Sequence, residues 1–179
     1  YTYKDNNLIS EITKKLGQTI ENITYTYDLK GNVLTTNDAI TDTTETKSYD
    51  YDGNVTTTIT VTMESQKLMA SNDYDGQGNV TVSSSETGNV TSESVTEYDA
   101  MGRPVKTVEN GITTTTEYDF LGRDIKTTTR ETGKADVVET KTYNANSTLT
   151  SESSSTGVTK QYTYDSRNRL LKTTTSGSD

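Results

Sequence analysis

The feature that most constrains this chain is a short motif, Tyr-Asp-x-x-Gly, that returns along its whole length. Eight tyrosines anchor copies of it at intervals of 20 to 25 residues, and these are Tyr3, Tyr27, Tyr49, Tyr74, Tyr98, Tyr118, Tyr143 and Tyr164. The residues that define its clearest copies are Tyr27, Asp28, Gly31, Tyr49, Asp50, Gly53, Tyr74, Asp75, Gly78, Tyr98, Asp99, Gly102, Tyr118, Asp119, Gly122, Tyr164 and Asp165. A fixed period of this length predicts a repeat architecture, in which each unit packs mainly on its neighbours.

Each repeat is divided a second time by another glycine. In six of the eight units a glycine follows the anchoring tyrosine by 13 to 15 residues, and these are Gly17, Gly88, Gly111, Gly133, Gly157 and Gly177. The two segments left in each unit have about seven to nine residues, which is the length of a β-strand. One face of the segment from Val55 to Met63 is expected to carry Val55, Thr57, Ile59, Val61 and Met63, and the other face Thr56, Thr58, Thr60 and Thr62. Period-two alternation with β-branched residues predicts strands.

The residues between the segments predict tight turns. The fifth position of the motif is glycine in five copies, asparagine in two (Asn7 and Asn168) and serine in one (Ser147). Glycine and asparagine tolerate positive φ, and the motif aspartate can accept hydrogen bonds from backbone N–H groups of the turn. Asn110-Gly111 is the strongest short hairpin signal in the chain. Together these features predict two antiparallel strands per unit, or roughly 14 to 16 strands.

Composition excludes several classes of function. The 179 residues contain no His, Cys or Trp, so zinc sites with His or Cys ligands, disulfides and a Ser-His-Asp triad are ruled out. No apolar run approaches the length of a membrane span. A formal net charge of −9 without a basic cluster argues against binding to nucleic acid or anionic lipid.

A hydrophobic fraction of 28% also raises the alternative of a disordered chain. The regular repeat favours order, and the 39 threonines suit the faces of a pleated sheet exposed to water.

The repeated residues admit other interpretations. The tyrosines could be platforms for sugar rings, but their regular register favours a ladder packed across neighbouring hairpins. The aspartates resemble calcium loops only loosely, and turn capping is favoured. Five Asn-x-Thr triplets occur at Asn22, Asn54, Asn79, Asn89 and Asn146, and we interpret them as by-products of the turn sequence. No catalytic, metal-binding or cofactor-binding residue is predicted, and no enzymatic activity.

The motif Tyr-Asp-x-x-Gly-Arg/Asn at this spacing resembles the YD repeats of the RHS family. The family includes bacterial RHS proteins, Gram-positive wall-associated proteins, components of insecticidal toxin complexes and animal teneurins. The resemblance implies β-hairpins joined into one long sheet that spirals into a hollow shell, which encloses a C-terminal effector domain in the toxin proteins. The family's C-terminal core, with its self-cleaving aspartyl site in some members, has no counterpart in this sequence.

We therefore expect an all-β fold of antiparallel hairpin repeats in a continuous curved sheet. Residues 1–179 are expected to form a single array of about eight units, excised from a longer bacterial protein. The expected function is that of a non-catalytic structural segment of a secreted or cell-surface protein, with its targeting signal outside this sequence. Its expected partners are neighbouring YD repeats and an enclosed effector domain. The alternative is an adhesion module that binds surface carbohydrates.

Overall fold

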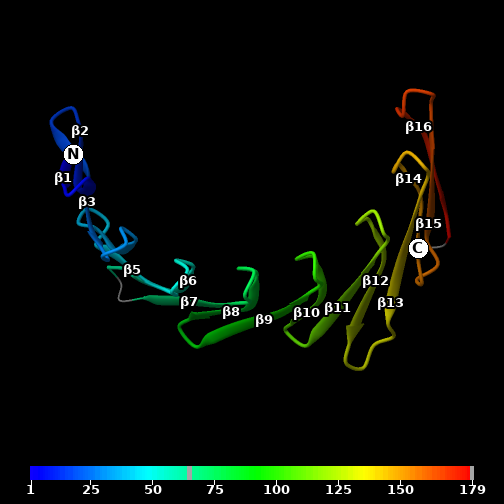
Figure 1. Cartoon of the computed structure of the whole chain (residues 1–179), viewed down its shortest axis with the longest axis horizontal. Coiled ribbons are helices and arrows are strands. Elements are labelled where there is room, and N and C mark those ends of the chain that lie inside the picture. Colours follow the sequence, from blue (N-terminus) through cyan, green and yellow to red (C-terminus); the bar gives the residue numbers. More distant parts are fainter. Residues whose placement is uncertain (64–65, 178–179) are drawn as a thin grey trace. The chain divides into compact units, whose positions relative to one another are not determined.

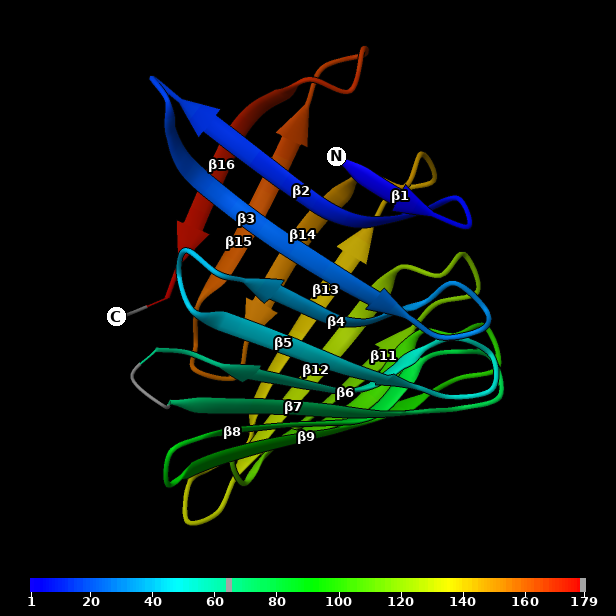
Figure 2. The same ribbon diagram turned by 90° about the vertical axis from the view of Figure 1, so that its left-hand side faces the viewer.

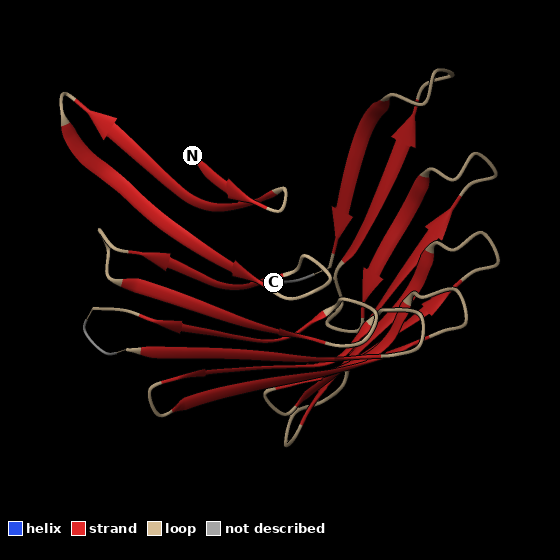
Figure 3. Ribbon diagram, turned by 60° about the vertical axis from the view of Figure 1, so that its left-hand side comes forward, coloured by secondary structure: helices blue, strands red, loops and turns tan. Residues whose placement is uncertain are grey.

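The computed structural model describes residues 1–63 and 66–177, and the remaining four positions of the expected 1–179 array lie outside the described residues. Strands and loops make up the described part of the chain, and it contains no helix (Figure 3). The first eight strands are β1 (Thr2–Lys4), β2 (Asn7–Lys15), β3 (Gln18–Tyr27), β4 (Val33–Asp38), β5 (Thr43–Tyr49), β6 (Val55–Val61), β7 (Lys67–Tyr74) and β8 (Val80–Thr87). The other eight are β9 (Val90–Tyr98), β10 (Pro104–Glu109), β11 (Ile112–Tyr118), β12 (Asp124–Glu131), β13 (Val137–Tyr143), β14 (Leu149–Ser154), β15 (Thr159–Tyr164) and β16 (Leu170–Ser176).

The strands form one antiparallel sheet whose order is the order of the chain, from β1 to β16 (Figure 1). This confirms the predicted all-β fold and two strands per repeat. The chain divides into two compact units, Tyr1–Val95 and Thr96–Asp179. In the first unit, the loops that join β3 to β4 and β5 to β6 lie at the same end of their strands, and the loop between β4 and β5 lies at the opposite end (Figure 2).

The sheet is a single layer without a buried core. Among the described residues, no hydrophobic and no polar residue is buried. Strands β4, β6, β12 and β14 consist almost entirely of half-exposed residues. The low apolar content of the sequence therefore has a structural counterpart, since within each unit no second layer of described residues covers the strands.

Most hairpins that carry the motif contain a bulge, which the sequence analysis did not predict. In seven of them the register shifts by one residue at the anchoring tyrosine. At β5 and β6, for example, Ser48 pairs with Thr57 and Tyr49 pairs with Val55, so Thr56 is the extra residue. A bulge of this kind increases the local twist of the two strands.

The bulge corrects part of the predicted alternation. Ser48 and Tyr49 are neighbours and point to opposite faces, so their partners Thr57 and Val55 also lie on opposite faces. The prediction that Val55 shares a face with Thr57 is therefore wrong. Met63 lies beyond the end of β6 at Val61.

The first copy of the motif also differs from its prediction. Asn7 was expected to occupy the positive-φ position of a turn, but it is the first residue of β2 and pairs with Lys4. The positive φ values fall instead at Asp5 (50°) and Asn6 (69°), which form a two-residue turn. Two successive left-handed residues define the tight hairpin turn that best matches strand twist.

The mid-unit turns offer a reciprocal test of this turn chemistry. Leu16-Gly17 and Asn110-Gly111 both join strands through two residues of positive φ, but Leu16 is fully exposed and gains no packing there. We expect Leu16→Asn to raise the free energy of unfolding by about 0.5–1 kcal/mol and Asn110→Leu to lower it by a similar amount, because asparagine tolerates this conformation. Urea unfolding of both variants checks this, and changes of the same sign in the two would contradict it.

Candidate functional site

The motif residues form one kind of turn that recurs at one end of the hairpins, here called the Tyr-Asp turn. It runs from the anchoring tyrosine to the sixth motif position, as in residues 27–32. In this copy the N–H of Asp28 donates to the carbonyl of Asn32 (2.9 Å), and the N–H of Gly31 donates to the carbonyl of Asp28 (3.2 Å). The same pair of backbone bonds recurs in the turns that begin at Asp50, Asp75, Asp99, Asp119, Asn144 and Asp165.

The motif aspartate caps the inside of the turn, as predicted. Oδ1 of Asp28 accepts the N–H groups of Lys30 (2.8 Å) and Asn32 (2.9 Å). The carboxylates of Asp75 and Asp119 accept the equivalent two N–H groups. An Asx turn of this kind satisfies backbone donors that the hairpin ladder leaves free.

The sixth motif position binds the second oxygen of the same carboxylate. Where this residue is asparagine, as at Asn32, its Nδ2 donates to Oδ2 of Asp28 (2.9 Å). Where it is arginine, as at Arg123, its Nε donates to Oδ2 of Asp119 (2.7 Å). Both side chains present an N–H donor at the same place, which explains why the motif accepts either residue.

These hydrogen bonds lower the pKa of the turn carboxyls below the ordinary value of 3.8. The largest cause is the side-chain hydrogen bond from the sixth position in the turns of Asp28, Asp50, Asp75, Asp99 and Asp119. In Asp165 the largest cause is the backbone N–H of Arg169.

The lowered pKa values predict acid sensitivity. A carboxyl whose pKa is depressed in the folded state contributes stability that is present above its unfolded pKa and is lost as pH falls through its folded pKa. We therefore expect the urea midpoint to fall steadily below about pH 4 and to change little between about pH 5 and pH 7. Asp119→Asn should flatten this dependence, and a protein that becomes more stable in acid would contradict the prediction.

The anchoring tyrosines tie each Tyr-Asp turn to the preceding hairpin. The hydroxyl of Tyr49 donates to the carbonyl of Val33 (2.7 Å), the first residue after the previous turn. The same bond to the first or second residue of the preceding strand is made by Tyr27, Tyr74, Tyr118, Tyr143 and Tyr164, at 2.7–3.0 Å. All seven anchoring tyrosines from Tyr27 onward are half-buried. The predicted tyrosine ladder is thus a series of links between the side chain of one repeat and the backbone of the one before.

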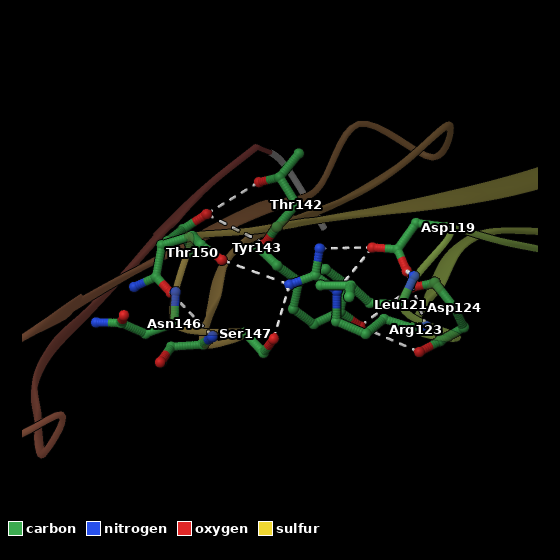
Figure 4. A network of polar contacts seen from close by, with 11 residues as sticks. Asp119, Leu121, Arg123, Asp124, Thr142, Tyr143, Asn146, Ser147 and Thr150 are labelled. Carbon is green, nitrogen blue, oxygen red and sulfur yellow. Dashed lines mark hydrogen bonds and ion pairs between the residues drawn. The ribbon is translucent and has the colours of Figure 1, made fainter.

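The arginine form of the motif adds a second link between neighbouring turns. The guanidinium of Arg123 lies over the ring of Tyr143, 4.6 Å from its centroid, while it also pairs with Asp119 (Figure 4). Nη1 of Arg123 reaches Oγ of Ser147 (3.2 Å) in the following turn. Arg103 lies in the same way over Tyr118, at 4.5 Å. Each of these arginines therefore holds its own turn and contacts the next one.

No protein-family model and no curated protein sequence matches this chain. Solved structures do match it. The crystal structures of TcdB2-TccC3 and of TcdB2-TccC3-Cdc42 superpose with a TM-score of 0.55 over 89% of this chain, at 15% sequence identity. A mutant Tc holotoxin pore from Photorhabdus luminescens superposes with a TM-score of 0.56, also at 15% identity. The chain has the RHS/YD-repeat fold. It spans about a tenth of the length of these toxin chains (10–11%).

Two turns that lack the motif aspartate have the same backbone geometry, one at Asn144 and one at Ser154. At Asn144, which replaces the motif aspartate, Oδ1 accepts the N–H groups of Asn146 (2.9 Å) and Thr148 (3.0 Å). At the other end of the strands, Ser154 makes the same two backbone bonds, with Val158 and with Gly157. The sequence marks the turn at Asn144 by an asparagine directly after an anchoring tyrosine. It marks the turn at Ser154 by a glycine, Gly157, three residues after a serine whose side chain can cap a turn.

Charged side chains on the faces of the sheet pair mainly with each other. A hollow of about 260 Å³ is lined by Glu139, Lys141, Glu152 and Lys160. Lys141 pairs with Asp124 (2.5 Å), and Glu152 contacts Lys160 (3.8 Å) and accepts the hydroxyl of Tyr162. That hydrogen bond raises the pKa of Tyr162 to about 12. These contacts cross between neighbouring strands and support the sheet.

Two further observations bear on function. Among residues 1–63 and 66–177, no group of three or more His, Cys, Asp or Glu residues is placed to hold a metal ion. The same residues include no helix that could cross a membrane. The anchoring tyrosines use their hydroxyls on backbone carbonyls of the chain itself, so the geometry gives no support to the alternative in which they bind carbohydrates.

Proposed function

We propose that this chain is a non-catalytic wall segment of a bacterial RHS/YD-repeat protein that is secreted or displayed on the cell surface. Its sheet would form part of a shell that encloses or presents another domain, such as a C-terminal toxin. The observation that carries this proposal is the single-layer sheet, in which repeats are joined by tyrosine hydroxyls and no described residue is buried. One of the similar structures is a Tc holotoxin pore, and another, TcdB2-TccC3-Cdc42, includes Cdc42 as a further protein. Both similarities support a shell that encloses another protein.

Physical reasoning supports a wall in preference to an independent catalytic domain. An enzyme needs a concave site in which groups are held rigidly and protected from water. In this sheet the polar side chains instead form hydrogen bonds within local turns and ion pairs between neighbouring strands, such as Lys126 with Glu117 (2.6 Å). A continuous hydrogen-bonded sheet with regular side-chain links is suited to mechanical separation of one compartment from another.

The test uses the whole reading frame that contains this chain. Limited proteolysis of its product should leave the proposed enclosed domain intact, because the shell denies access to the protease. A double variant, Tyr118→Ala with Tyr143→Ala, should expose that domain to cleavage, whereas Phe120→Ala, at a turn tip and 91% exposed, should not. A reading frame without further YD repeats or another domain would contradict the proposal, as would equal cleavage in all variants.

A further inference from the structure

Three places in the chain join an acidic or amide residue directly to glycine, and these are Asp52-Gly53, Asp75-Gly76 and Asn110-Gly111. Such a pair can react with itself, because the backbone nitrogen of the glycine can attack the side-chain carbonyl carbon of the residue before it. Glycine has no side chain to obstruct that approach. Asparagine is the better electrophile, since its carboxamide can expel ammonia whereas a carboxylate repels a nucleophile. Asn110 is the only one of the 13 asparagines that is followed by glycine.

Hydrogen bonds occupy the reacting groups of the two Asp-Gly pairs. In Asp52-Gly53 the glycine N–H donates to the carbonyl of Asp50 (3.3 Å). In Asp75-Gly76 both carboxylate oxygens accept hydrogen bonds from Asn79, one from its N–H and one from its Nδ2 (each 2.9 Å). Each of these groups must leave a partner before it can react, so the fold protects both pairs.

The Asn110-Gly111 pair has neither form of protection. Within the described part of the chain, the carboxamide of Asn110 and the N–H of Gly111 have no hydrogen-bond partner. Both residues are exposed, and a β-carbon at Gly111 would meet no atom within 4 Å. Nucleophile and electrophile are thus neighbours in one turn, both open to water.

We propose that Asn110 is a site of spontaneous modification, at which the carboxamide becomes a carboxylate with water as the only co-reactant. The nitrogen of Gly111 bonds to Cγ of Asn110, the Cγ–Nδ2 bond breaks, and ammonia leaves with the proton from the Gly111 N–H. Water then opens the cyclic imide at either of its carbonyl carbons. Opening at Cγ gives aspartate, opening at the backbone carbonyl gives isoaspartate, and the new carboxyl group releases its proton. This reaction does not depend on what the proposed shell encloses.

The modification acts on the hairpin of β10 and β11. Their ladder ends at the pair of Glu109 with Ile112, so the turn between them has only two residues. Isoaspartate adds a methylene group to the main chain of this turn, which then no longer matches the register of the strands. The new negative charge also lies beside Glu109 and close to Glu131, the partner of Ile112 on β12, and like charges at such positions destabilise a sheet.

The test incubates the folded 179-residue protein in mildly alkaline buffer and follows every asparagine by peptide mass mapping. The peptide that contains Asn110 should gain about one dalton, because NH₂ is replaced by OH. Labelling by a protein isoaspartyl methyltransferase should be confined to this peptide and absent from Asp52-Gly53 and Asp75-Gly76. Asn79 should react at least about tenfold more slowly, because its carboxamide must first leave a charged partner.

Leu16→Asn is the matched control. It creates a second Asn-Gly pair in a two-residue turn of the same left-handed backbone, at a fully exposed position. This new pair should react at a rate similar to that of Asn110, and an unreactive pair would contradict the assignment of the reactivity to the turn. A synthetic peptide of residues 106–115 gives the rate without the fold. If Asn110 reacted in the peptide but stayed unmodified in the protein, the proposal would be overturned, as it would by equal rates at Asn110 and Asn79.

Discussion

Replacing Tyr143 with alanine is expected to lower the free energy of unfolding by about 2–3 kcal/mol. The ring of Tyr143 is half-buried beneath the guanidinium of Arg123, and its hydroxyl donates to the carbonyl of Asp124 (3.0 Å). Truncation removes the apolar contact, the cation–ring contact and the hydrogen bond together. Urea unfolding monitored by circular dichroism measures the loss.

Two matched variants separate these contributions. Tyr143→Phe keeps the ring and should lose only about 1 kcal/mol, because it removes the hydroxyl alone. Phe120→Ala removes an aromatic ring of similar size from a position that is 91% exposed, and it should cost less than about 0.5 kcal/mol. A Tyr143→Ala variant as stable as Phe120→Ala would show that the tyrosine link does not hold neighbouring repeats together.

Replacing Gly78 with valine is expected to destabilise the protein by about 2–3 kcal/mol, although a β-carbon at this position would meet no atom within 4 Å. The cost comes from the backbone alone, because Gly78 has φ of 83° in the turn that Asp75 caps. A β-branched side chain strongly disfavours this conformation. Thermal or urea unfolding of the variant tests the prediction.

Gly76, two residues earlier in the same turn, supplies the control. It has equally open space around it but does not have positive φ, so Gly76→Ala should be neutral or stabilising by up to about 1 kcal/mol. Gly78→Asn should lose less than Gly78→Val, because Asn168 occupies the equivalent position with φ of 59°. Equal losses at Gly76 and Gly78 would refute the backbone explanation.

Local chemistry made the Tyr-Asp turns and strands predictable from the sequence. Every group that closes the turn at Asp119 lies within four residues of it, from the N–H of Leu121 to the guanidinium of Arg123. Such short-range bonds depend only on residue type and spacing, so a motif is enough to specify them. The position of the strands also follows from period-two alternation, but the face of a residue beyond a bulge, such as Val55, does not.

The links between repeats were decided by the tertiary structure. Tyr118 and Tyr143 find their acceptors 14 and 19 residues back along the chain, and which carbonyl each one reaches depends on the register between its own strand and the preceding one. The stacking of Arg123 on Tyr143 depends on the same register. The sequence pattern does not show where a bulge falls. The bulge nevertheless decides which face and which partner each residue beyond it has. The sequence by itself therefore determined the turns and the strands, and only the pairing of those strands decided how one repeat holds the next.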